Sequence, residues 1–316
     1  MLFGVIAGIS WGLETFVLGI ALSMTPFVSD QQALFLAPFV STFLHDLCSA
    51  IFSCAYNGVR GQLPAVIKAL KSDVGKYVML AGLIGGPIGM TGYVLTIKYM
   101  GASIGAVASA VFPAIGAVLA CIFLKEKMKW YRWILLIITL LGVYGLSYSP
   151  DLSISNFWLG IVGALMCSFG WGIEGVILAK CFTSPDVKNE YALQIRQTTS
   201  ALIYAIIILP VIKGWGLTTK LFIYPDFRYV LPIIALAALF ATISYFSYYK
   251  AISKVGVSKA MALDISYVAW AMIFTVLFKK DYSVLSPITI ICALLVVVCG
   301  ILAATDFKQL FSKNKN

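Results

Sequence analysis

The chain has 316 residues, of which 61% are hydrophobic and 11% are charged, and its mean hydropathy is +0.95. Soluble globular proteins carry about 25% charged residues, so this composition excludes a soluble domain and indicates an integral membrane protein. The net charge of +10 does not indicate nucleic-acid binding, because the basic residues stand in short clusters between apolar runs, as the positive-inside rule predicts for the loops of membrane proteins.

Apolar segments along the chain are long enough to cross a bilayer, for which a helix needs about 20 residues. Lipid offers the backbone no hydrogen-bond partners, so we expect an all-α membrane protein of ten transmembrane helices. The first run lacks a basic n-region and a cleavage pattern, which predicts that it is retained as a span. In chain order, the predicted spans are residues 2–24, 32–56, 74–97, 103–124, 130–149, 157–181, 190–213, 228–251, 259–278 and 285–304.

The distribution of Lys and Arg predicts the orientation of these spans. If the N-terminus is cytoplasmic, most basic residues of the connections fall on the inner side, including Lys68, Lys71 and the cluster from Lys125 to Lys129. The outer connections hold few, such as Lys98 and Lys213. The positive-inside rule therefore favours both termini in the cytoplasm, and we expect a multi-pass protein of the inner (plasma) membrane.

Two halves of the chain, residues 1–150 and 151–316, contain matching segments. With five spans each, an odd number, the second half would be inverted relative to the first. Inverted repeats of this kind are typical of transporters, whose substrate site lies near the midplane between the halves. The matches are Trp11-Gly12-Leu13-Glu14 with Trp171-Gly172-Ile173-Glu174, His45-Asp46 with Arg196-Gln197, Ser49-Ala50 with Ser200-Ala201, residues 97–103 with 252–258, and Lys125-Glu126-Lys127 with Lys279-Lys280-Asp281.

Helix-interrupting residues gather in the third and fourth predicted spans. Six of them, Gly82, Gly85, Gly86, Pro87, Gly89 and Gly92, lie in the third span, and Pro113 lies in the fourth. Proline removes a helix hydrogen bond, and glycines let helices approach closely. Close packing without transport is one interpretation; together with the repeat, the pattern favours half-bundles that move.

Glu14 and Glu174 are carboxylates inside long apolar runs. Such residues are expensive in a bilayer and mark functional sites by default. Trp11 and Trp171 precede them by three residues and therefore lie on the same helix face. A ring face beside a carboxylate suits an organic cation. The alternative is that each Trp packs between helices and each Glu is tied to a neighbouring helix.

Further aromatic residues are spaced for helical stripes. Tyr245, Tyr248 and Tyr249 have i, i+3, i+4 spacing, and Asp264, Tyr267 and Trp270 follow one another at threes. The intramembrane Asp264 favours a binding stripe over mere packing or an interfacial belt. We therefore count these six residues among the candidate site residues.

His45, the single histidine of the chain, lies with Asp46 in the middle of the second predicted span. Histidine titrates near neutral pH, so the pair is a candidate proton relay; a structural hydrogen bond across helices is the alternative. Asp46 is also a possible partner for Arg196, an intramembrane cation. For Arg196 we expect a gating or structural role, since a cation site would not place an arginine against its ligand.

These motifs resemble the drug/metabolite transporter superfamily, EamA-like members, and within it most of all the bacterial lic-type choline transporters. The residues that carry the resemblance span nearly the whole chain. They are Gly8-Ile9-Ser10-Trp11-Gly12, His45-Asp46, Gly86-Pro87-Ile88-Gly89-Met90, Lys98-Tyr99-Met100-Gly101-Ala102-Ser103, Trp171-Gly172-Ile173-Glu174, Ile195-Arg196-Gln197-Thr198-Thr199-Ser200, Ser247-Tyr248-Tyr249 and Ser266-Tyr267-Val268-Ala269-Trp270.

The resemblance implies import of choline, or a similar quaternary ammonium compound, by symport with protons or driven by the membrane potential. Glu174 is then the first candidate for the charge partner of the substrate, Glu14 shares that role or carries the coupling proton, and Gln197 hydrogen-bonds the choline hydroxyl. The choline transporters have a small residue at Glu14 and an amide at Asp264. These extra acids leave open another cation, such as a polyamine, or export of amino acids or amine-bearing metabolites and drugs.

No enzyme motif is present in the sequence, and the His45 and Ser49 pair is the one arrangement that resembles a nucleophile with its base. The seven cysteines show neither a disulfide framework nor metal-ligand spacing. We therefore expect a protein that is not an enzyme and that has no cofactor and no metal, with a small organic cation and the lipid bilayer as partners. The sequence leaves both a monomer and a homodimer open.

Overall fold

The computed structural model of the protein describes residues 1–148 and 154–305, and within these ranges every regular element is a helix. By length and composition, nine helices in the described ranges are able to span a membrane, and Val107–Phe123 is a shorter apolar helix. The all-α class is therefore confirmed. The nine helices coincide with nine of the predicted spans, and the remaining predicted span, residues 103–124, coincides with the helix Ala102–Phe123.

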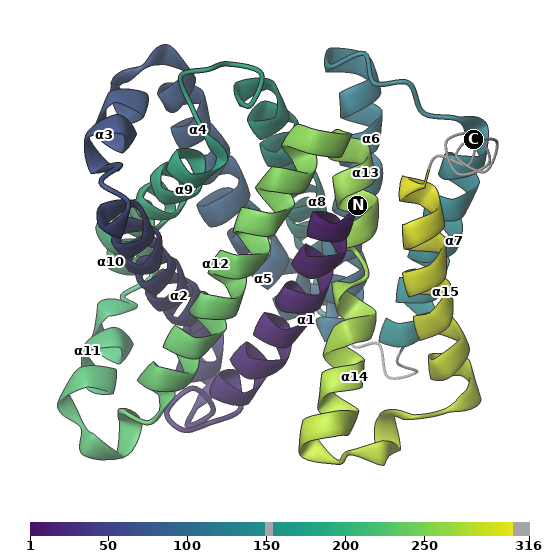
Figure 1. Ribbon diagram of the computed structural model, residues 1–316. Helices are drawn as coiled ribbons and strands as arrows, with labels where there is room; N and C mark the ends of the chain where they lie inside the picture. The colour runs from purple at the N-terminus through teal and green to yellow at the C-terminus, as the bar shows by residue number, and fades with distance from the viewer. Residues whose placement is uncertain (149–153, 306–316) are drawn as a thin grey trace.

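In chain order the helices form two groups, one for each predicted half, and the two groups interleave in space (Figure 1). The N-terminal end of α1 and the C-terminal end of α15 lie at the same end of the bundle (Figure 1). The first group comprises α1 (Leu2–Leu22), α2 (Gln31–Val59), α4 (Asp73–Leu83), η1 (Ile84–Ile88), α5 (Gly89–Met100), α6 (Ala102–Phe123) and α7 (Trp130–Ser147). The second comprises α8 (Phe157–Cys181), α9 (Asn189–Ile203), η2 (Tyr204–Ile208), α10 (Leu209–Val211), α12 (Val230–Val255), α13 (Val257–Asp264), α14 (Tyr267–Lys279) and α15 (Pro287–Ala304).

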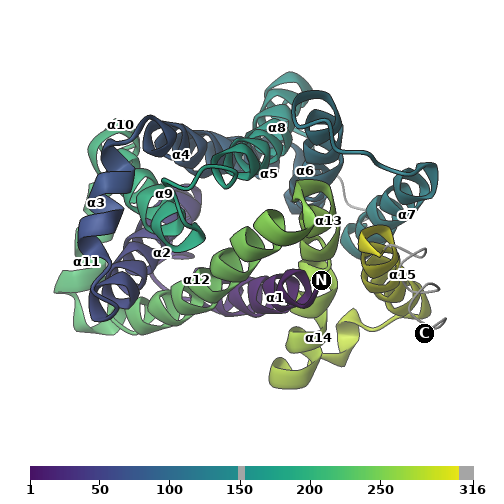
Figure 2. The ribbon, with the colours of Figure 1, turned by 45° about the horizontal axis from the view of Figure 1, so that its top comes forward.

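The helices pack in corresponding pairs. The first helix of the first half, α1, packs on α12, α13 and α14, while the first helix of the second half, α8, packs on α5 and α6. The helices α2 and α9 contact each other, as do α7 and α15. Glycines permit the approach: a Cβ on Gly12 would lie 2.5 Å from Trp270 Cβ, and one on Gly172 would lie 3.0 Å from Ile115. Figure 2 shows α1 lying alongside α12.

Two glycine linkers have the same conformation at matching positions of the halves. Gly101 joins α5 to α6 with φ 89° and ψ 162°, and Gly256 joins α12 to α13 with φ 88° and ψ 160°. Side chains disfavour positive φ, so glycine is the residue that makes these turns without strain. Each helix therefore ends within one residue of where the next begins.

The predicted interruption of the third span is a π-helical turn, η1, between α4 and α5. Pro87 has no amide hydrogen to donate, and the amide of Gly89 bonds the carbonyl of Ile84, one residue beyond its α-helical partner. The carbonyl of Gly85 accepts instead from Trp171 Nε1 at 2.8 Å. The turn thus ties the first half to the tryptophan of the second.

A second π-helical turn, η2 (Tyr204–Ile208), interrupts the seventh span. We did not predict it. Pro210 follows within the same helical run, and its ring clashes with the carbonyl of residue 206 in a regular α-helix. One proline without a glycine run is a weak signal in the sequence, although it has the same physical effect here.

The ninth predicted span is broken, which corrects the expectation of one continuous helix. α13 ends at Asp264 and α14 begins at Tyr267. Between them, Ser266 Oγ donates to the carbonyl of Leu263 at 2.7 Å, and such serine-to-backbone bonds compete with helix bonds. The predicted stripe of Asp264, Tyr267 and Trp270 along one helix is therefore wrong, because Asp264 belongs to the preceding helix.

Short helices fill connections for which the sequence predicted none. α3 (Leu63–Lys71) and α11 (Trp215–Ile223) lie at opposite ends of the bundle (Figure 1). Each buries a few apolar side chains, among them Val66 and Ala69 in α3 and Leu217 and Leu221 in α11. Their spacing of three to four residues places these side chains on one face, toward the ends of the spanning helices.

Candidate functional site

A chain of buried charged groups crosses the centre of the bundle through four helices. Glu14 of α1 faces His45 of α2, with 3.5 Å between Oε1 and Nε2. His45 Nδ1 lies 3.0 Å from Asp46 Oδ1, and Asp46 Oδ2 lies 3.6 Å from Arg196 Nη1 of α9. Arg196 Nε in turn donates to Glu174 Oε1 of α8 at 2.7 Å. All five residues are at most 7% exposed.

Arg196 connects several of these buried polar groups. Its guanidinium contacts both oxygens of Glu174, with a second bond from Nη2 at 3.4 Å, and its Nη1 donates to Gln197 Oε1 at 2.7 Å. Its Cζ lies 4.7 Å from the ring centroid of Tyr245. The Asp46 to Arg196 contact that the sequence suggested is present, but the shorter ion pair is with Glu174. The alternative for Glu174, a tie to a neighbouring helix, thus describes its geometry.

Polar residues from the two halves bond one another reciprocally around this chain. Ser200 Oγ donates to Asp46 Oδ2 at 2.6 Å, and Gln197 Nε2 donates to Ser49 Oγ at 3.0 Å. Ser49 also shares a hydrogen bond of 2.8 Å with Thr242. The sequence analysis matched these serines as part of the repeat but did not count them as site residues. Each stands one helical turn beyond a matched pair, His45-Asp46 or Arg196-Gln197.

The His45 ring lies between two carboxylates. A neutral imidazole donates from one nitrogen only, whereas an imidazolium donates from both. In this arrangement each nitrogen faces a carboxylate oxygen, Nδ1 toward Asp46 and Nε2 toward Glu14. The geometry therefore accommodates one additional proton, which either makes His45 an imidazolium or makes Glu14 a neutral carboxyl group. Ser49 contacts Gln197 and Thr242 rather than His45, so the structure does not assemble a nucleophile and base from this pair.

Two cavities adjoin the charged chain. The larger cavity, of about 310 Å³, is lined by Glu14, His45, Asp46 and Arg196 together with Leu18, Thr42, Gly85, Met90 and Tyr93, among others. The smaller cavity, of about 60 Å³, is lined by Glu174, Asp264, Ser244, Tyr248, Tyr249 and Phe112, among others. Only the larger one falls in the size range of small-molecule sites, about 300–1,000 Å³.

Four aromatic residues line both cavities and form what we call the aromatic wall: Trp11, Trp171, Tyr245 and Tyr267. Trp11 meets Tyr245 edge-on with centroids 5.0 Å apart, and it meets Tyr267 edge-on at 6.4 Å. Trp171 is held by its bond to Gly85 and by edge contact with Phe112 at 5.9 Å. The predicted tryptophans of the two halves are thus brought together between two acid-lined spaces.

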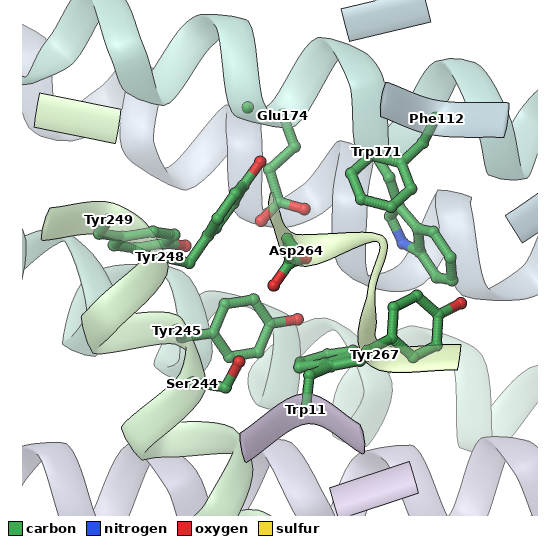
Figure 3. A pocket seen from close by; sticks show the side chains of 11 residues that line it. Trp11, Phe112, Trp171, Glu174, Ser244, Tyr245, Tyr248, Tyr249, Asp264 and Tyr267 are labelled. Carbon is green, nitrogen blue, oxygen red and sulfur yellow. The ribbon is translucent and has the colours of Figure 1, made fainter. Parts of the chain in front are cut away.

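Asp264 lies in the smaller cavity, where its carboxylate points toward the space between Glu174 and Tyr245 (Figure 3). It is 8% exposed, and its Oδ1 has no hydrogen-bond partner among the described residues. Unpaired buried carboxylate oxygens are costly. Among the described residues, none therefore supplies a hydrogen-bond partner for this oxygen of Asp264.

Two predicted site residues lie outside both cavities. Gln197 is fully buried in the hydrogen-bonded chain beside Arg196. Trp270 packs on Gly12 of α1 and stacks at a tilt on Phe274, with centroids 6.4 Å apart. Conversely, Tyr93, Phe112 and Ser109 line the cavities without having been predicted. They lacked a signal because no charge or repeat marks them.

A hollow of about 930 Å³ lies elsewhere, between α4, α6 and α8. Its lining is mostly apolar, with Lys180, Thr183 and Ser184 at one side and without a carboxylate among its lining residues. It is larger than the two central cavities, but no carboxylate lines it to attract a cation. In the described residues, no cluster of His, Cys, Asp and Glu is arranged to hold a metal ion.

Comparisons with known proteins agree with this architecture. Residues 1–148 match the EamA-like transporter family. Protein LicB of Haemophilus influenzae is 28% identical over 97% of each chain. A solved protein crystal structure, 15% identical, has a TM-score of 0.71 and covers 100% of this chain and 98% of its own, which establishes likeness of fold. These similarities confirm the predicted resemblance to the drug/metabolite transporter superfamily: the first 148 residues match a transporter family, and the described residues hold nine helices able to span a membrane.

Proposed function

We propose that this protein imports choline, or a similar small quaternary ammonium compound, across the plasma membrane by alternating access. The observation that carries the proposal is the aromatic wall, which stands between two cavities lined by carboxylates. A quaternary ammonium group has no N–H to donate, so aromatic faces and nearby negative charge are what bind it. The motifs shared with the lic-type choline transporters support the same substrate class.

The charge balance of the site favours a cation. Glu14, Asp46 and Glu174 together carry three negative charges when ionised, against one positive charge on Arg196 and at most one on His45. At least one negative charge is left over, before Asp264 is counted. Uncompensated charge inside a membrane is costly, and a bound cation or a proton would remove that cost.

The paired packing of the helices supports alternating access by two inverted five-helix halves, residues 1–150 and 151–316. α1 meets α12 as α8 meets α5, and both glycine linkers have one conformation. In inverted-repeat transporters the halves rock around a central site. The charged chain joins both halves here, so it is placed to sense such a motion.

For the coupling we propose that the proton lies on the Glu14, His45 and Asp46 group. A cation that enters the larger cavity neutralises Glu14 and thereby competes with a proton held between Glu14 and His45. Arg196, which faces the same group from α9, stays engaged with Glu174. Cation and proton are then linked through one carboxylate.

The test is uptake of labelled choline into proteoliposomes, with the parent protein and with Glu14→Gln. We expect saturable uptake by the parent that grows when the proteoliposome interior is the more acidic side, because a cation and a proton that compete for Glu14 exchange for one another. Uptake by Glu14→Gln should be lower by about tenfold or more and should no longer respond to the gradient. Absence of saturable uptake by the parent would refute the choline proposal. Counterflow from preloaded vesicles reports whether the same site works in export of amines, the alternative direction.

A further inference from the structure

We infer that the smaller cavity is a second binding site for the substrate, which we call the second seat. In it, Asp264 and the surrounding aromatic rings hold the quaternary ammonium head. This inference rests on the proposed function and refines it. Sequence reasoning placed the substrate charge on Glu174. The geometry instead assigns Glu174 to Arg196 and leaves Asp264 for the ligand.

The two acids that line the smaller cavity, Glu174 and Asp264, differ in their partners. Both oxygens of Glu174 are bonded by Arg196, at 2.7 and 3.4 Å. Asp264 lines the same cavity with an Oδ1 that has no partner among the described residues, although the side chain is buried. Burial of an unpaired carboxylate is unfavourable unless something neutralises it. A cation bound in the cavity is therefore most strongly attracted to Asp264.

Aromatic rings surround Asp264 in the smaller cavity. In Figure 3, Trp11, Tyr245, Tyr248 and Tyr267 surround the Asp264 carboxylate. Aromatic faces attract an alkylated ammonium, which has no N–H to donate. The lining thus suits an organic ammonium ion.

Asp264 also lies at the break between α13 and α14. α13 ends at Asp264, so the negative end of its dipole adds to the field of the carboxylate. In transporters, the C-terminal ends of interrupted helices commonly face bound cations. α1 packs on the break through Gly8, where a Cβ would lie 2.5 Å from Ser266 Oγ. The seat is therefore coupled mechanically to the helix that carries Trp11 and Glu14.

The size of the cavity sets its selectivity. At about 60 Å³, the cavity lies far below the range of about 300–1,000 Å³ for drug-sized ligands, so it suits a compact group. Tetramethylammonium is such a group, whereas tetraethylammonium carries one more carbon on each arm. The seat accepts the head of choline and rejects larger ammonium ions.

The experiment is equilibrium binding to the full-length protein in nanodiscs, with labelled choline displaced by tetramethylammonium or tetraethylammonium. For the parent we expect tetramethylammonium to displace choline, and tetraethylammonium to do so at least about tenfold more weakly. Asp264→Asn preserves the shape but removes the charge, and we expect it to weaken tetramethylammonium binding at least about 30-fold. Asp226→Asn, at an exposed acid of η3 (Pro225–Phe227), is the matched control.

The outcomes separate the two proposals. If the parent binds choline saturably but Asp264→Asn binds tetramethylammonium like the parent, the second seat is wrong and the proposed function stands. If the parent binds neither cation, the proposed function itself fails. The tetraethylammonium comparison uses the parent alone, so it tests the seat even if Asp264→Asn does not fold; equal displacement by both ions would overturn the inference.

Discussion

Arg196 shows how one cation organises several acids in a membrane protein. It contacts Glu174, Asp46 and the ring of Tyr245 from a side chain that is 2% exposed. A buried ion pair gains little net stability over an apolar pair, but removal of one partner leaves an uncompensated buried charge. Arg196 is thus required by its neighbours, whose carboxylates it pairs with inside the bundle.

We predict that Arg196→Gln destabilises the protein by about 3–5 kcal/mol, because Glu174 and Asp46 both lose their cation. Thermal unfolding in a mild detergent measures this as a lowered midpoint. Arg60→Gln, at an exposed arginine at the end of α2, is the control and should change the midpoint little. The double variant Glu174→Gln, Arg196→Gln should be more stable than Arg196→Gln alone; equal midpoints would contradict the pairing.

The π-helical turn η1 decides how closely the third span approaches α8. A Cβ on Gly85 would lie 1.7 Å from Glu174 Oε2, and one on Gly89 would lie 2.8 Å from Trp171 Nε1. The glycine run in the sequence predicted that the third span packs closely against another helix, but not which helix. The π-helical turn determines the partner, because it frees the Gly85 carbonyl to accept a hydrogen bond from Trp171 of α8.

At this element we predict that Gly85→Ala displaces the Glu174 carboxylate and costs about 1–3 kcal/mol by overpacking, with lower choline uptake. Gly216→Ala, at an exposed position of α11, is the control, since a Cβ at Gly216 meets nothing within 4 Å; it should be neutral or slightly stabilising, as alanine is the better helix former. Both are measured by thermal unfolding and proteoliposome uptake. Normal uptake by Gly85→Ala would mean that the Glu174 position is not needed.

At the scale of the whole molecule, the start of α1 and the end of α15 lie at the same end of the bundle, and α3 and α11 mark opposite ends (Figure 1). α3 carries Lys68 and Lys71 in its last turn. From the positive-inside rule we predict that the α3 end faces the cytoplasm and that the α11 end faces the outside.

Reporter fusions test this orientation. Alkaline phosphatase fused after Lys220 in α11 should be active, because that enzyme folds outside the cytoplasm, and the same reporter fused after Lys71 in α3 should be inactive. A cytoplasmic fluorescent protein at these two positions should give the opposite pattern. Activity of both phosphatase fusions, or the reverse pattern, would contradict the assigned topology.

The sequence by itself determined the class of the protein and singled out the buried acids of the candidate site. Hydropathy located the spans, since a bilayer demands about 20 apolar residues regardless of how helices pack. Charges inside those spans singled out Glu14, Asp46, Glu174 and Asp264, because their burial is expensive wherever they point. The matched Trp-Gly-x-Glu segments further indicated that both halves contribute to one site.

Only the tertiary structure decided which of these residues meet. The bond from Arg196 to Glu174 joins different helices, and a periodic pattern fixes directions within a helix but not the partner across it. The break after Asp264 arises from a serine bond and from glycine packing against α1, both of which are tertiary or local effects too weak to read from hydropathy. The Trp171 and Glu174 segment was predicted as the cation site, whereas the packing ties Glu174 to Arg196 and leaves Asp264 unpaired in the same cavity.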